Sequence, residues 1–121
     1  MFAIIKMVNE EPSVENITSS SIRYICNGDI EAMDFPGDDN IVIYCNEEYL
    51  LNGSTANLML PEYNNFICDN IVICGFDKET GTDRDLTQPE IEKVMNYIKK
   101  NKLHNITSGM AFYKLLLRSD K

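Results

Sequence analysis

The sequence predicts an α+β fold, with a small, mainly antiparallel sheet of about four to five strands and two to three helices. Short apolar runs bounded by turn residues predict the strands. Near the C-terminus, apolar residues spaced i, i+3, i+4 and i+7 predict a helix instead. The 121 residues have ordinary apolar and charged fractions, so we expect a single domain over residues 1–121.

The first half of the chain predicts a strand, a short helix and a hairpin. Residues 2–8 are almost continuously apolar, which is typical of a central strand. The apolar spacing at 22–26 predicts a short helix that ends at Asn27-Gly28. In residues 29–45, charged and apolar residues alternate, a Pro-Gly turn follows and a second apolar run ends the segment. This pattern predicts an antiparallel hairpin.

The second half is less uniform. Residues 54–65 contain a proline and neighbouring asparagines, which predict a loop, whereas 66–76 predict one bent strand or two short ones. Thr87, followed by proline and glutamate, predicts the start of an amphipathic helix. Residues 110–118 predict a last helix, with a strand as the alternative. We expect this last element to belong to a helical C-terminal extension over residues 99–121.

Negative charge is concentrated in the first two thirds of the chain. Residues 1–86 carry sixteen carboxylates against four basic side chains, a net charge of −12. Residues 87–121 carry three carboxylates against seven basic side chains, a net charge of +4. The acidic part repels phosphate backbones, so we expect no direct binding of nucleic acid, and it attracts basic protein surfaces.

Motifs that indicate catalysis are scarce. Neither a phosphate-binding glycine loop nor a serine-hydrolase motif occurs, and the single histidine, His104, is expected in a solvated loop. The four cysteines lack close pairing and are expected to be buried, reduced thiols. We therefore expect no enzymatic activity, cofactor or metal. Without a signal peptide or an apolar run of membrane length, we also expect a cytoplasmic protein with no membrane partner.

Carboxylates on and beside the predicted hairpin form the candidate partner-binding surface. Two adjacent carboxylates directly follow its second strand, flanked by tyrosines that can anchor a partner. A strand end with a solvated cap is the alternative interpretation. The candidate residues are Asp29, Glu31, Asp38, Asp39, Asn46, Glu47, Glu48 and Tyr49.

Several short motifs resemble the domain of unknown function 3846 family. They are Gly28-Asp29-Ile30-Glu31, Cys45-Asn46-Glu47-Glu48, Leu51-Asn52-Gly53, Ile71-Val72-Ile73-Cys74-Gly75, and Leu86-Thr87 followed by Glu90-Ile91-Glu92-Lys93. The resemblance covers about residues 2–98. It implies a small protein carried by phages, plasmids and related elements, with no assigned activity. The chain departs from the family pattern at Tyr49, where members tend to have glycine, and at 54–57, where they tend to have a step rich in proline and asparagine.

Charge, the scarcity of motifs and the resemblance together predict a non-enzymatic binding protein of a mobile element. The first hypothesis is an inhibitor of host defence that docks its acidic hairpin on a basic, nucleic-acid-binding host protein of CRISPR or restriction type. The alternative is a binder that sequesters a nucleotide immune signal: Tyr44, Tyr49 and Tyr63 would stack on bases, and Arg23, Arg84 or the C-terminal lysines would meet phosphates. Exposed edge strands also allow a homodimer.

Overall fold

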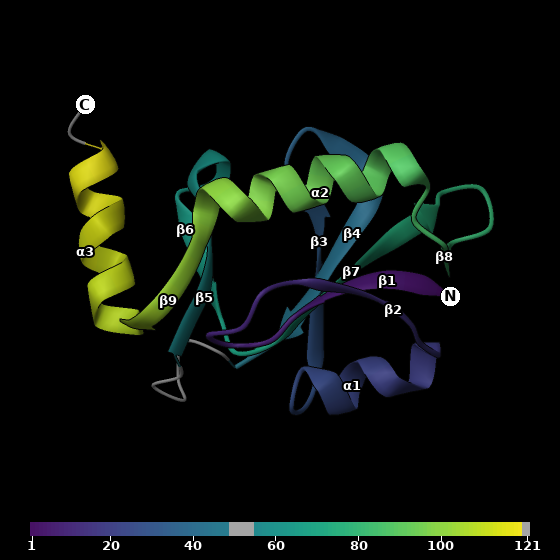
Figure 1. The fold of residues 1–121 in the computed structure, drawn as a ribbon, viewed down its shortest axis with the longest axis horizontal. Helices are drawn as coiled ribbons and strands as arrows, with labels where there is room; N and C mark the ends of the chain where they lie inside the picture. The colour runs from purple at the N-terminus through teal and green to yellow at the C-terminus, as the bar shows by residue number, and fades with distance from the viewer. Residues whose placement is uncertain (49–54, 120–121) are drawn as a thin grey trace.

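The computed structural model describes residues 1–48 and 55–119 and arranges them in two antiparallel sheets and three helices (Figure 1). The larger sheet consists of β1 (Phe2–Lys6), β2 (Ser13–Asn16), β3 (Ile30–Phe35), β4 (Asp38–Asn46), β7 (Ile71–Asp77) and β8 (Thr82–Arg84). The smaller sheet consists of β5 (Thr55–Leu60), β6 (Asn65–Cys68) and β9 (Lys102–Thr107). The helices are α1 (Ile22–Ile25), α2 (Gln88–Asn101) and α3 (Ser108–Ser119), with 3-10 turns η1 (Ser19–Ser21) and η2 (Pro61–Tyr63). The predicted α+β class is confirmed.

The larger sheet has the strand order β2-β1-β7-β4-β3, and β8 pairs with the end of β7. β1 lies between two neighbours, which explains its continuous apolar run. The predicted hairpin is confirmed as β3–β4, with Ile30 opposite Asn46. α1 covers one face of the sheet, and α2 lies on the opposite side (Figure 1).

The smaller sheet corrects two predictions. Residues 54–65 were expected to form a loop, yet β5 is the central strand of this sheet, between β6 and β9. The sequence pattern that would predict a strand is weak here, because β5 is buried from Ala56 to Leu60 and shows no alternation of polar and apolar residues. The second correction concerns β9, a strand within the C-terminal extension that was expected to be helical over residues 99–121. It carries His104, expected in a loop, with its side chain exposed.

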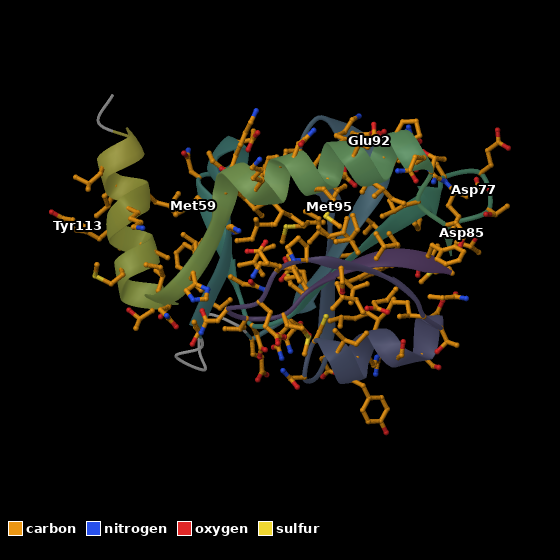
Figure 2. All side chains as sticks on the ribbon, viewed as in Figure 1. Met59, Asp77, Asp85, Glu92, Met95 and Tyr113 are labelled. Atoms are coloured by element: carbon orange, nitrogen blue, oxygen red, sulfur yellow. The ribbon has the colours of Figure 1, made fainter. Side chains whose placement is uncertain are left out.

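Helices α2 and α3 pack on opposite sides of the smaller sheet. Thr87 and Glu90 form a reciprocal capping box that begins α2, as the sequence predicted for Thr87. Val94 and Ile98 of α2 are buried, and Met95 also points toward the sheets (Figure 2). α3 confirms the predicted last helix and buries Ala111 completely. The core therefore continues from the larger sheet through the smaller one to α3.

Candidate functional site

Asn46 fastens the end of β4 to the loop that follows α1. Its side-chain amide donates hydrogen bonds to the carbonyl oxygens of Cys26, at 3.0 Å, and Asn27, at 3.1 Å. Its side-chain oxygen accepts a hydrogen bond from the Glu48 backbone N–H at 2.8 Å. The residue is only 5% exposed, so its polar atoms are occupied within the chain. Asn46 therefore positions its neighbours, and its own side chain is turned away from solvent.

Four carboxylates surround this clamp, and we call them the acidic end of the hairpin: Asp29, Glu31, Glu47 and Glu48. The Glu47 backbone N–H donates to the Asp29 carbonyl oxygen at 2.8 Å, which joins the two strands at this end. Asp29 forms a long ion pair with Arg23, 3.7 Å between nitrogen and oxygen, and both side chains are largely exposed. Glu31, Glu47 and Glu48 are exposed and form no ion pair with any described residue.

Asp38 and Asp39 lie at the opposite end of the hairpin, which we call the turn end. Asp38 accepts a hydrogen bond from the Lys93 ammonium of α2 at 2.8 Å, and Asp39 pairs with Lys78 at the same distance. The hydrogen bond from Lys93 lowers the pKa of Asp38, and the Asn40 backbone N–H contributes in the same direction. Both carboxylates of the turn end are thus paired with lysines.

The sequence-predicted residues therefore divide into two groups. β4 runs for nine residues between them, and at about 3.3 Å per residue the two ends are roughly 25 Å apart. The structure brings together Asp29, Glu31, Asn46, Glu47 and Glu48 and separates them from Asp38 and Asp39. Tyr49, the last candidate, lies outside the described residues.

Arg84 and Glu90 form a cluster that the sequence interpretation missed. The guanidinium binds both carboxylate oxygens of Glu90, at 2.8 and 2.9 Å, and donates to the carbonyl oxygens of Asn40 and Asp85. It lies against Gly75, where a Cβ would collide with it and would lie 2.7 Å from the Asp85 carbonyl oxygen. The capping box was the feature of the sequence that could have indicated this cluster. Its Glu90 carboxylate accepts hydrogen bonds both from the Thr87 backbone N–H and from Arg84.

A buried polar network joins the two sheets. Lys6 is 1% exposed, and its ammonium donates to the Asn57 side-chain oxygen at 2.6 Å and to the Met7 carbonyl oxygen at 2.9 Å. The Asn57 amide donates to the carbonyl oxygens of Lys6 and Asp69. Burial lowers the pKa of Lys6, whereas Glu11 raises it. Since its partners are on β5 and the adjoining backbone, the lysine holds the sheets together.

The thiols offer no activated nucleophile. All four cysteines are buried and unpaired, and burial raises the pKa of Cys26, Cys45 and Cys74 to about 12 and that of Cys68 to about 11. Such thiols stay protonated at neutral pH. Among the described residues, no group of three or more histidine, cysteine or acidic side chains is placed to hold a metal ion.

A groove of about 540 Å³ runs between α2 and the turn end of the hairpin. Its lining combines lysines, amides and aromatic rings: Phe35, Pro36, Gly37, Glu62, Lys93, Asn96, Tyr97, Lys100 and Asn101. Phe35 and Tyr97 pack edge to face with their centroids 5.1 Å apart, and the Tyr97 hydroxyl donates to Glu62. Tyr44 and Arg84, candidates for a nucleotide site, are instead engaged by Asp83 and Glu90.

The family model described as "Domain of unknown function (DUF3846)" matches residues 1–99. The chain belongs to this family. The match spans 99 of 121 residues, from β1 to near the end of α2, and so includes the whole β3–β4 hairpin. Searches of curated proteins and of solved structures found no match.

The geometry explains several motifs of this DUF3846 member in structural terms. The Asn46-Glu47-Glu48 step is a clamp followed by two displayed carboxylates, and Gly75 makes room for Arg84. β9 and α3 lie beyond the matched segment, although β9 completes the smaller sheet by pairing with β5. Within the described ranges, no helix is long and apolar enough to cross a membrane.

Proposed function

We propose that this protein is a non-enzymatic binding protein whose acidic end docks on a basic, nucleic-acid-binding surface of a partner protein. The observation that supports the proposal is the exposure of Glu31, Glu47 and Glu48 without an ion-pair partner among the described residues. Glu31 is on β3, the last strand in the order of the larger sheet, and Glu47 and Glu48 lie just beyond the end of the neighbouring β4. Because all three side chains are exposed at this corner of the sheet, a partner can approach them without displacing another element.

The proposed mechanism is competition for charge. Carboxylates at the acidic end would occupy lysine and arginine side chains that otherwise hold phosphates, so nucleic acid and this protein exclude each other. The net charge of −12 over residues 1–86 steers a basic partner toward this region, and salt weakens the attraction. The rigid clamp at Asn46 supports the same mechanism, because it fixes the backbone from which Glu47 and Glu48 project.

The proposed partner is a host defence nuclease of CRISPR or restriction type, inhibited in the bacterial cytoplasm by a protein of a mobile element. The resemblance to phage and plasmid proteins and the concentration of negative charge support this proposal. The test is retention of purified nucleases of these two types on the tagged full chain, together with their cleavage of DNA in its presence. Retention accompanied by loss of cleavage is the expected result.

Two triple variants with the same net charge test whether partner affinity depends on the position of the carboxylates or only on the total charge. The acidic end is reversed by Glu31→Lys, Glu47→Lys and Glu48→Lys, and the control reverses three exposed carboxylates elsewhere, Glu15→Lys, Glu79→Lys and Glu92→Lys. Each reversal adds two charges, so both triple variants change the net charge from −8 to −2. We expect the first variant to lose affinity by about 100-fold and the control to lose much less. Equal losses would contradict docking by the acidic end.

A second candidate function is sequestration of a nucleotide, and the groove beside α2 favours it. Its volume lies in the range of small-molecule sites, Lys100 can meet a phosphate, and Asn96 and Asn101 offer amides. The test is calorimetric titration of the chain with cyclic and linear nucleotides, with Lys100→Gln as the variant and Lys114→Gln, a lysine on α3, as the control. Binding that only Lys100→Gln weakens would support this function.

A further inference from the structure

α3 exposes far more apolar surface than any other element described. Of the ten large apolar side chains that are exposed in the described residues, five lie on this helix of twelve residues. They are exposed to between 48% and 58%: Met110, Phe112, Tyr113, Leu116 and Leu117. Isolated apolar residues are normal on a protein surface, but a contiguous group of this kind marks an interaction site.

The exposed side chains form one continuous stripe. At 100° per residue they span about 160° of the helix circumference, opposite the side on which Ala111 is buried and Leu115 half-buried. α3 lies at one end of the molecule, and Tyr113 points away from the body (Figures 1 and 2). The helix is thus apolar on the side that packs inward and on the side that faces solvent. A helix with this pattern is ordinarily buried on both sides.

We propose that a second copy of this chain covers the stripe, through an antiparallel pairing of α3 with its counterpart about a two-fold axis. A two-fold interface must be self-complementary, and a stripe without charge satisfies this requirement. At about 100 Å² of exposed area per side chain, two stripes would bury roughly 1,000 Å², the lower limit of specific interfaces.

Little charge on the helix itself opposes a second copy. Residues 108–117 contain no carboxylate and a single basic side chain, Lys114, so the stripe can meet its counterpart with little repulsion between like charges. Glu90 and Glu92 stand at the start of α2, whereas α3 follows its far end through β9. Lys114 lies on the flank of α3, about 40° beyond Met110, which forms the nearest edge of the stripe. An anionic membrane is the competing occupant: the basic side chains of residues 93–119 would attract it, whereas the net charge of −12 over residues 1–86 would repel it. The vesicle experiment below separates it from a second copy.

The experiment is sedimentation equilibrium of the full chain from low micromolar to several hundred micromolar concentration. The mass is expected to rise from 13.8 kDa toward twice that value. Tyr113→Gln with Leu117→Gln is expected to weaken association by about 100-fold, since each substitution occurs twice in a two-fold dimer. Both residues are about half exposed, so folding is expected to persist, and circular dichroism checks it. The matched control is Tyr24→Gln on α1, 87% exposed, which is expected to leave the dimer unchanged.

Cross-linking tests the geometry independently. Tyr113 lies near the middle of the stripe, so Tyr113→Cys is expected to form a disulfide between two copies under mild oxidation, whereas Tyr24→Cys is not; the four native thiols are buried. A monomer at every concentration would overturn the proposal, as would equal association of the Tyr113/Leu117 variant and the wild type. A monomer that sediments with phosphatidylcholine–phosphatidylserine vesicles would also overturn it and would assign the stripe to a lipid surface.

Discussion

The two ends of the β3–β4 hairpin carry the same kind of side chain in different surroundings. At the turn end, Asp38 and Asp39 are each paired with a lysine at 2.8 Å. At the acidic end, the buried amide of Asn46 makes the bonds that hold the backbone, and Glu47 and Glu48 are left to the solvent. The carboxylates of the turn end thus form ion pairs within the chain, whereas Glu47 and Glu48 at the acidic end remain exposed and can contact a partner.

This difference shows that a cluster of carboxylates in a sequence does not by itself define a binding surface. Neighbouring residues decide whether a carboxylate is satisfied within the chain, and Lys93 of α2 is distant in sequence from Asp38. An exposed, unpaired carboxylate contributes little to folding and can be used for binding at small cost. Substitutions at the two ends should therefore separate stability from binding.

The largest effect on stability is expected for Asn46→Ala, at the acidic end. The substitution removes two donated hydrogen bonds and one accepted hydrogen bond from a buried position. The carbonyl oxygens of Cys26 and Asn27 lose their partner, so the free energy of unfolding should fall by about 2–3 kcal/mol. Urea denaturation measures this change.

The matched control is Asn40→Ala on the same strand. Asn40 is exposed; its backbone N–H donates to Asp38 and its carbonyl oxygen accepts from Arg84, and the substitution keeps both of these hydrogen bonds. Its effect should stay within about 0.5 kcal/mol. If Asn40→Ala lowered the free energy of unfolding as much as Asn46→Ala, the loss could not be assigned to the buried hydrogen bonds of Asn46.

The second effect in size is expected for Arg84→Met, which acts near the turn end. The substitution removes the two hydrogen bonds to Glu90 and the bond to the Asn40 carbonyl oxygen of β4. Because the Arg84 side chain is one-third exposed, water replaces part of the loss, and we expect about 1–2 kcal/mol. Arg84→Lys keeps the charge but not the paired geometry, so its loss in the same urea denaturation should be intermediate.

Local patterns in the sequence predicted the parts of the fold that depend on local signals. The alternation over residues 29–45 gave the hairpin, and Thr87 gave the start of α2, because hydrogen bonds between nearby residues specify both. β5 was missed because a strand buried on both faces shows no alternation, and its asparagine, Asn57, resembles a loop residue. Asn57 is buried because Lys6, fifty-one positions away, requires an acceptor.

The candidate site was predicted in composition but not in arrangement. The acidic end was located because Asp29 and Glu31 begin one strand of a predicted hairpin and Glu47 and Glu48 follow the other, so an antiparallel pairing brings them together. The role of Asn46 could not be predicted, since its partners Cys26 and Asn27 come from another element. The pairing of Asp38 with Lys93 likewise depends on how α2 packs over the sheet. Contacts between distant segments are set by tertiary packing, which a single sequence does not display.

A smaller effect is expected for Asp38→Asn at the turn end, and it should depend on pH. The ion pair with Lys93 is partly exposed, so its loss should cost about 0.5–1 kcal/mol at neutral pH. The folded-state pKa of Asp38 is lowered, so its stabilising contribution is present above the unfolded pKa and disappears as pH falls through the folded value. The stability difference between wild type and variant should therefore shrink below about pH 4. A difference that stays constant down to pH 2 would contradict this role.

The smallest effect on stability is expected for the pair Glu47→Gln and Glu48→Gln at the acidic end. Both side chains are exposed, and the hydrogen bonds of this segment are donated by the backbone N–H groups, which glutamine retains. The free energy of unfolding should stay within about 0.5 kcal/mol of the wild type, while affinity for a basic partner should fall and become less sensitive to salt. Urea denaturation and a salt series of partner binding measure the two quantities. If the stability fell as it does for Asp38→Asn, the two ends of the hairpin would not differ, and the acidic end would belong to the fold.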